Sequence, residues 1–433
     1  MKPPAFHSTH PTEGMKPTGV RYVVLSLTFV TAMIMYIDRV CIGAAAPVIR
    51  AEFGFDRITM GYVFAAFSLG YAVFQVPGGW AADRFGPRRI LALAVLWWSA
   101  FTAATAAASG AASMIAYRFL FGVGEASAFP SASRALVRWL PVSQRAFGQG
   151  FQHAGSRFGA AITPPLVITL IGITGWRGVF YLLGGIGIAW ATIWYWYYRD
   201  CPEDHAGVNG MELRILSRSG FQGKRRAPGV VPWGTILRSW NLWALSLMYF
   251  CYGWVVWMYL AWLPTYLVEE RGFTDLKMGL AASTPLLAAT ISNAMGGWVS
   301  DKLAHRWGDL RRGRLFVSCI GFAIGAVGLV PGALASSSAA ALLWLTIALA
   351  GLELTVAVSW AICLDIGGEY SGSVSSVMNT CGNLGGALSG VVVGYLATWL
   401  AWTAPLLVSA GLCVAAALIA TRIDPRRSAV AAV

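Results

Sequence analysis

Long apolar stretches recur along the whole chain, and they constrain the fold more than any other feature of the sequence. Each is at least about 20 residues long, which is the length of helix needed to cross the hydrocarbon core of a bilayer. Twelve such stretches lie between charged or Pro- and Gly-containing breaks, at 20–46, 59–81, 89–109, 112–136, 147–172, 177–198, 239–267, 277–300, 314–334, 339–363, 372–398 and 402–421. We therefore predict an all-α membrane protein with twelve transmembrane helices.

The low share of charged residues excludes a soluble enzyme. Charged residues make up 12% of the chain, whereas a soluble domain has about 25%. The net charge of +13 would suggest a nucleic-acid partner in a soluble protein. In a membrane protein, Lys and Arg gather on the cytoplasmic loops and report orientation. We expect no nucleic-acid partner.

The Lys and Arg residues divide unequally between the two sides of the predicted membrane. One side holds 24 of the 32, the other holds five, and three fall inside spans. The positive-inside rule places the crowded side in the cytoplasm. We predict a cytoplasmic tail at 1–19, a six-helix bundle at 20–198, a cytoplasmic linker at 199–238, a second six-helix bundle at 239–421 and a cytoplasmic tail at 422–433.

The two sets of six spans resemble each other. The second span ends in Gly78-Gly79-Trp80-Ala81-Ala82-Asp83-Arg84, and the eighth ends in Gly296-Gly297-Trp298-Val299-Ser300-Asp301-Lys302. Likewise, Gln152 with Gly155 and Gly159 in the fifth span parallels Asn379 with Gly382 and Gly386 in the eleventh. Two similar bundles around a central cavity are typical of transporters that work by alternating access.

The loop after the second span carries a family signature. Its pattern comprises Gly79, Asp83, Arg84, Gly86, Arg88 and Arg89, with Pro87 as a departure. This pattern resembles the cytoplasmic loop motif of the major facilitator superfamily. The resemblance implies the major facilitator fold of two pseudo-symmetric six-helix bundles, in which this loop helps to gate the conformational change.

Three further motifs are similar to those of the anion:cation symporter family, which includes bacterial sugar-acid carriers and sialin. They are Tyr36-Ile37-Asp38-Arg39 in the first span, Phe67-Ser68-x-Gly70-Tyr71-x-x-x-Gln75-x-Pro77-Gly78-Gly79 in the second and Arg118-Phe119-x-x-Gly122-x-Gly124-Glu125 in the fourth. The resemblance implies proton-coupled symport of organic carboxylates. It also implies that Asp38 and Glu125 carry the coupling proton.

The charges inside the predicted spans support this interpretation independently. A charged residue at the bilayer centre costs about 2.5–3.5 kcal/mol on insertion scales, so it is paired, faces a cavity or is functional. Asp38 and Arg39 are neighbours, so they project about 100° apart on a helix. Arg118 and Glu125 are seven residues apart and share one face.

We interpret Arg39 as the group that binds the substrate carboxylate, because a guanidinium presents a fork of donors and stays charged. The alternative is a structural ion pair with Asp38 or Glu125. These two acids are the candidate proton sites. Burial raises the pKa of a carboxyl group and a nearby arginine lowers it, so the balance can change when helices move. We expect Arg118 to pair with one or both of them, as a coupling residue or as a static clamp.

Neutral hydrogen-bonding and aromatic side chains should surround this anchor, because a sugar acid also offers hydroxyl groups. The candidates are Tyr36, Tyr71, Gln152, Asn379, Ser359 and Trp360. Each could instead serve as a polar contact between helices.

Three other ionisable residues in the spans have two interpretations each. Glu353 is a second proton or substrate-selective group, or it makes interhelical hydrogen bonds. Arg157 binds a second carboxylate of a diacid, or it contacts lipid headgroups or another helix. His153 is a proton group, or a packing residue.

The sequence thus predicts a proton-coupled secondary transporter that imports a small organic anion. The alternative is an exporter or facilitator of aromatic acids or drugs, in which the buried charges are structural locks. No nucleophile–base pair or metal-ligand set is evident, so we expect no enzyme, no metal and no cofactor other than the proton gradient. We expect a monomer in a bacterial inner membrane.

Overall fold

The computed structural model describes residues 16–217 and 231–429, and every element assigned there is helical. In chain order the elements are α1 (Val20–Phe53), α2 (Arg57–Phe85), α3 (Pro87–Ala106), α4 (Ala111–Glu125), α5 (Ala128–Trp139), α6 (Val142–Tyr197), η1 (Pro202–Asp204), α7 (Gly210–Ser217), α8 (Trp233–Ile236), α9 (Trp240–Glu269), α10 (Asp275–Trp307), α11 (Leu310–Leu334), α12 (Ser338–Gly367), η2 (Gly368–Tyr370), α13 (Ser371–Trp399) and α14 (Thr403–Ala420).

These helices make twelve passes, as the apolar stretches predict. The long α6 makes two of them, because the chain reverses at Gly175, whose φ of 70° lies in the left-handed region that glycine tolerates. One pass is shared by α4 and α5, which are separated by a break at Ala126 and Ser127. Among the described residues, nine helices are apolar and long enough to span a bilayer. The helices outside that set include α10 and the two short pieces of the broken pass.

Several passes begin at a side chain that caps the helix. The Asp56 carboxylate accepts a hydrogen bond from the main-chain N of Thr59 at 2.7 Å, at the start of α2. Hydrogen bonds from Thr59 hold the pKa of Asp56 below its usual value, so this cap is charged at neutral pH. Asp309 and Ser337 cap α11 and α12 in the same way. Polar breaks in the sequence thus define where helices start.

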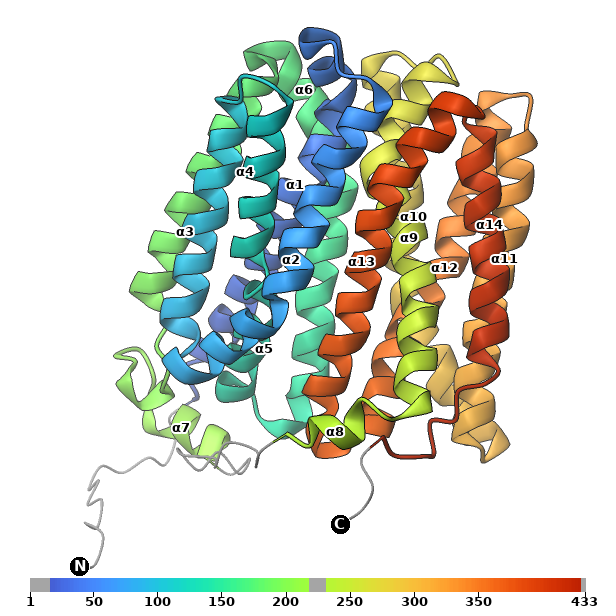
Figure 1. The fold of residues 1–433 in the computed structure, drawn as a ribbon. Coiled ribbons are helices and arrows are strands. Elements are labelled where there is room, and N and C mark those ends of the chain that lie inside the picture. The colour runs from blue at the N-terminus through green and yellow to red at the C-terminus, as the bar shows by residue number, and fades with distance from the viewer. Residues whose placement is uncertain (1–15, 218–230, 430–433) are drawn as a thin grey trace, which may run out of the picture.

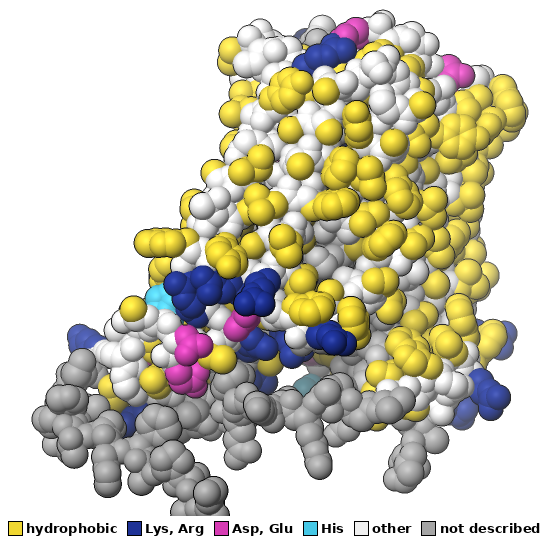
Figure 2. Space-filling model, turned by 60° about the vertical axis from the view of Figure 1, so that its left-hand side comes forward, with side chains coloured by type: hydrophobic (Ala, Val, Ile, Leu, Met, Phe, Trp, Pro, Cys, Tyr) yellow, Lys and Arg dark blue, Asp and Glu magenta, His cyan; other side chains and the backbone are white. Residues whose placement is uncertain are grey.

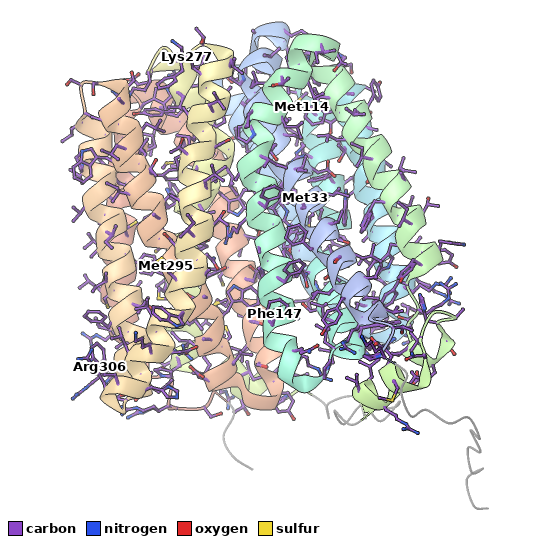
Figure 3. The ribbon with its side chains drawn as sticks, turned by 180° about the vertical axis from the view of Figure 1, so that it is seen from behind. Met33, Met114, Phe147, Lys277, Met295 and Arg306 are labelled. Atoms are coloured by element: carbon purple, nitrogen blue, oxygen red, sulfur yellow. The ribbon has the colours of Figure 1, made fainter. Side chains whose placement is uncertain are left out.

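The twelve passes form two groups, α1–α6 and α9–α14, which lie side by side in Figure 1. The short α7 and α8 lie at one end of both groups. We call this the linker end. Lys and Arg side chains gather near it on the face shown in Figure 2. From behind, Figure 3 shows Arg306 at the linker end and Lys277 at the other end of α10.

The two groups contact each other through three pairs of helices, α1 with α9, α2 with α13, and α6 with α10. The contacts concentrate toward the end opposite the linker. There, the main chains of α2 and α13 approach so closely that a Cβ on Gly61 would overlap the main chain at Gly390. Glu269 of α9 pairs with Arg50 of α1 and, at 2.8 Å, with Arg57 of α2. This end of the molecule is therefore closed.

The ion pairs that can be described near the linker end each lie within one group. Among the described side chains, Arg138 pairs with Asp200 at 3.0 Å, and Arg314 pairs with Asp301 at 2.7 Å and with Asp365 at 3.2 Å. Each of these pairs holds helices of one group together. The described ion pairs thus join the two groups at the end opposite the linker, and they stay within each group at the linker end.

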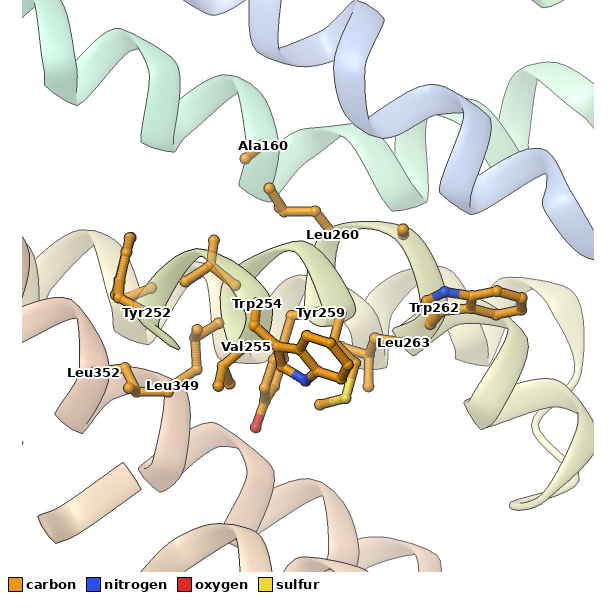
Figure 4. Packing of buried hydrophobic residues seen from close by; sticks show 14 of the residues in the cluster. Ala160, Tyr252, Trp254, Val255, Tyr259, Leu260, Trp262, Leu263, Leu349 and Leu352 are labelled. Atoms are coloured by element: carbon orange, nitrogen blue, oxygen red, sulfur yellow. The ribbon is translucent and has the colours of Figure 1, made fainter. Parts of the chain in front are cut away.

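Helix α9 forms the centre of the apolar packing. Figure 4 shows Leu260 reaching toward Ala160 of α6, while Leu349 and Leu352 of α12 lie on the other side of α9. In a bilayer the lipid is as apolar as a leucine, so helices associate through close packing that small residues permit. Gly253 of α9 supplies such a contact, because its Cα faces the main chain of Gly382 in α13.

We expect Gly253→Leu to destabilise the protein by about 1–3 kcal/mol, because the new side chain would overlap the main chain of α13 and force the helices apart. The measurement is the thermal unfolding midpoint of the purified protein in detergent. Gly411→Leu is the matched control, since a Cβ at Gly411 meets no atom within 4 Å. Equal midpoints for the two variants would contradict the packing argument.

Candidate functional site

Six ionisable side chains lie near the middle of their passes, five of them buried and Arg157 half-buried. They are Asp38 and Arg39 of α1, Arg118 and Glu125 of α4, Arg157 of α6 and Glu353 of α12. We call these six residues the central charge cluster. Five of them belong to helices of the first group, and Glu353 belongs to the second group. Arg157 lies on the α6 pass that faces the second group.

Arg39 lies in a box of aromatic rings and pairs with Glu125. Its Nε donates a hydrogen bond to Glu125 Oε2 at 2.5 Å, and the two side chains are 5% and 0% exposed. The guanidinium carbon lies 4.9 Å from the ring centre of Tyr36, 5.2 Å from that of Phe67 and 4.7 Å from that of Tyr71. Aromatic faces stabilise a desolvated cation. This box therefore keeps a charged guanidinium at the centre of the molecule.

Asp38 faces away from Arg39, as adjacent positions on a helix require. Its Oδ2 accepts a hydrogen bond from Nε1 of Trp98 in α3 at 3.1 Å, and its Oδ1 has no partner among the described residues. The side chain is fully buried. Asp38 is thus held by one neutral donor, in a pocket formed by the first group of helices.

Arg118 departs from its predicted arrangement. We expected an ion pair with Asp38 or Glu125, but no ion pair to either carboxylate is formed in the described part of the chain. Within the described structure its Nε and Nη1 have no hydrogen-bond partner, and the guanidinium lies over the rings of Phe121 at 4.3 Å and Phe67 at 5.3 Å. Arg39 occupies one oxygen of Glu125 in its place, and the other oxygen of Glu125 has no partner among the described residues.

Arg157 and Glu353 form an ion pair between the two groups of helices. Arg157 Nη2 lies 3.0 Å from Glu353 Oε2. Glu353 also accepts hydrogen bonds from the Tyr252 hydroxyl at 2.8 Å and from Asn293 Nδ2 at 2.9 Å. This geometry agrees with the interpretation of Glu353 as an interhelical acceptor and of Arg157 as a residue that contacts another helix.

The neutral candidates lie in different surroundings. Tyr36 and Tyr71 face Arg39 directly. Gln152 is buried and its Oε1 has no described partner, whereas Asn379 is half-buried. The Ser359 hydroxyl is buried and donates to the main-chain O of Thr355 in its own helix, which leaves it less able to serve a substrate.

An aromatic row crosses between the groups on the linker side of Arg157. The imidazole of His153 lies 5.1 Å from the ring centre of Phe129 and 6.0 Å from that of Trp360. Trp360 Nε1 donates to the Tyr249 hydroxyl at 3.2 Å. His153 is therefore packed between rings, which agrees with its interpretation as a packing residue.

The loop signature lies at the linker end of α2 and α3. Gly86 has a φ of 84°, and a Cβ there would overlap the carboxylate of Asp200. The main-chain N of Arg88 donates to Asp200 Oδ1 at 3.2 Å. Arg84 stacks over Trp80, and Gly79 lies near Pro130 of α5. The side chain of Asp83 lies outside the described part of the structure.

Comparison with known proteins identifies the family. The family model described as Major Facilitator Superfamily matches residues 28–390. The chain belongs to the Major Facilitator Superfamily. Solved structures agree at the level of the fold. A bacterial homologue of the human lysosomal transporter Spinster, solved in an inward-facing and unoccupied conformation, matches with a TM-score of 0.77 at 18% identity, over 94% of this chain and 97% of that one.

Relatives of this superfamily chain carry transporter names. A probable sulfoacetate transporter of Cupriavidus necator is 37% identical, over 94% of both chains. The D-galactonate transporter of Escherichia coli O6:H1 is 32% identical, over 89% of this chain and 91% of its own. The hexuronate transporter of Bacillus subtilis is 30% identical, over 92% and 93%. The protein is therefore a multi-pass membrane transporter and not an enzyme.

Sequence reasoning missed three neutral partners of the buried acids, namely Trp98, Tyr252 and Asn293. Single aromatic and amide residues occur in most spans of this chain, so their positions alone do not single them out. Asn293 lies three residues before the repeated Gly296-Gly297 motif, which is the one signal that could have drawn attention to it.

We expect Arg39→Met to destabilise the protein by about 3–5 kcal/mol, because it leaves the Glu125 carboxylate buried without its partner. Adding Glu125→Gln should recover most of this loss, since the uncompensated charge disappears. Unfolding midpoints in detergent for the two single variants and the double variant test this. A double variant as unstable as Arg39→Met would show that the unpaired Glu125 carboxylate is not the cause of the lost stability.

Proposed function

We propose that this transporter couples proton movement to the import of a small organic anion by alternating access. The single observation that supports this most directly is the Arg39–Glu125 ion pair at the centre of the protein, inside its aromatic box. A guanidinium binds a carboxylate through two parallel hydrogen bonds. In the proposed bound state, a substrate carboxylate takes the place of Glu125 at Arg39.

Exchange of the two carboxylates gives a physical basis for coupling. Ionised Glu125 competes with the substrate for Arg39, whereas protonated Glu125 has no charge and releases the guanidinium. Proton binding and substrate binding therefore favour each other, which is the condition for symport. Asp38 is the second proposed proton site, since its Oδ1 has no described partner. Arg118, which has two free nitrogen donors, is placed to approach either acid when the helices move.

The proposed substrate is a small carboxylate such as a sugar acid. The relatives are named as transporters of sulfoacetate, D-galactonate and hexuronate, all of which carry a carboxylate group. Tyr36 and Tyr71 would orient the carboxylate, and Gln152 and Asn379 would bind hydroxyl groups from the two opposed groups of helices. Trp360 is a weaker candidate, because its Nε1 donates to Tyr249, and so is Ser359.

Alternating access would use the two ends of the molecule in turn. We infer that the structure corresponds to the inward-facing state, because the end opposite the linker is closed by Arg50, Arg57 and Glu269. In the same proposal the linker end is cytoplasmic, since Lys and Arg gather there. The loop containing Gly79, Asp83, Arg84, Gly86 and Arg88 would then gate the cytoplasmic side, in a monomer in a bacterial inner membrane.

We expect proteoliposomes with an imposed inward proton gradient to accumulate one or more of galactonate, glucarate, glucuronate, sulfoacetate, phthalate and tartrate. Arg39→Ala should lower uptake by on the order of 100-fold, because losing a charged hydrogen-bonding partner costs about 2–5 kcal/mol of binding. Arg177→Ala, which removes an exposed ion pair with Glu52, is the control and should retain uptake. Outward flux of aromatic or cationic compounds, with no anion uptake, would favour an exporter.

The role of Glu125 in coupling can be separated from its role in folding. We expect Glu125→Gln to exchange labelled for unlabelled substrate across the liposome membrane, since its neutral amide no longer competes for Arg39. The same variant should fail to accumulate substrate against a concentration gradient when a proton gradient is imposed. Accumulation at the wild-type level would overturn the assignment of Glu125 as a coupling residue.

A further inference from the structure

The ion pair between Arg157 and Glu353 joins two helices that are not main packing partners. The main partner of α6 in the second group is α10, whereas Glu353 lies on α12. The ion pair is therefore a side-chain connection between α6 and α12. His153, one turn before Arg157, meets Trp360, two turns after Glu353, so two side-chain contacts cross the same gap.

The two members of this pair are held unequally. Glu353 is 1% exposed, and it is fixed within the second group by Tyr252 of α9 and Asn293 of α10. Arg157 is 16% exposed, and its polar partners among the described residues, Glu353 and the Tyr252 hydroxyl at 3.4 Å, belong to the second group. If Arg157 turns away, Glu353 keeps two hydrogen bonds. The arginine is thus the partner that can leave, because Glu353 stays held by neutral donors of its own group.

Arg157 also lies near the proposed anion anchor. Tyr36 stacks against the Arg39 guanidinium at 4.9 Å, and its ring centre lies 6.5 Å from that of Phe129. Phe129 in turn lies 5.1 Å from the imidazole of His153, which is one turn before Arg157. A row of three rings therefore connects the Arg39 guanidinium with the part of α6 that carries Arg157.

We propose that Arg157 is a second anion anchor, exposed when an acidic group displaces Glu353, and that the protein prefers small substrates with two acidic groups over those with one. This inference rests on the proposed function, because it takes Arg39 as the first anchor. It assigns Glu353 as a competitor that lowers the affinity for the second acidic group. In this proposal, substrate binding also breaks the Arg157–Glu353 ion pair, which joins the two groups of helices at the centre of the protein.

The test compares matched ligands that differ in one acidic group. Galactarate and galactonate form one pair, and sulfoacetate and 2-hydroxyethanesulfonate form another. Equilibrium binding to the purified full-length protein in detergent gives a Kd for each ligand, and the readout is the ratio of the two Kd values within a pair. A selectivity ratio is insensitive to a loss of correctly folded protein.

We expect the wild type to bind the diacid of at least one pair more tightly. Arg157→Gln should reduce that preference about tenfold or more, because it removes a charge-assisted hydrogen bond to the second acidic group. Glu353→Gln should increase the preference by a similar factor, because the competing charge is gone. Arg157→Lys, which keeps the charge without the fork, should fall between the wild type and Arg157→Gln.

Arg177→Gln is the matched control, since it makes the same substitution in an exposed ion pair and should leave the ratio unchanged. An unchanged Kd ratio in both Arg157→Gln and Glu353→Gln would overturn the assignment of Arg157 as a second anchor. The same conclusion would follow if both variants bound the diacid and the monoacid more weakly by the same factor. Neither outcome would affect the role of Arg39. If the wild type binds and transports none of the four ligands and none of the wider anion panel, the proposed function itself fails, and this inference fails with it.

Discussion

Charge buried at the centre of an apolar environment is the constraint on which this structure depends. Each guanidinium there is compensated in a different way. Arg39 has a carboxylate and aromatic faces, Arg157 has a carboxylate from the other group of helices, and Arg118 has aromatic faces alone. Because an uncompensated charge costs several kcal/mol in such surroundings, these contacts determine how the central helices are placed.

The two ends of the molecule differ in how the two groups of helices are joined. At the end opposite the linker, glycines allow main chains of the two groups to touch, and Glu269 joins Arg50 and Arg57 across the contact. Near the linker, the ion pairs of the described residues stay within one group. In the proposed alternating-access cycle, the two groups would rock about the centre of the protein, where Arg157 and Glu353 meet.

Much of this arrangement was predictable from the sequence. The apolar stretches predicted the twelve passes, and helical geometry predicted that Asp38 and Arg39 face apart. The sequence did not show which groups Arg118 contacts in this structure, because spacing along a helix defines a shared face but not the reach of a side chain toward a particular oxygen. Trp98, Tyr252 and Asn293 were missed, since a neutral residue in an apolar span has no distinctive pattern until its buried partner is known.

By itself, the sequence determined the number and order of the passes and which ionisable residues must lie inside the membrane, because both follow from hydrophobicity along one chain. The tertiary structure alone decided which carboxylate meets which guanidinium. That choice depends on distances between helices far apart in the sequence. Arg39 and Glu125 are 86 residues apart, and Arg157 meets Glu353 from the other half of the protein. Helical periodicity cannot specify such contacts, since it orients a side chain about its own helix and carries no information about the neighbouring one.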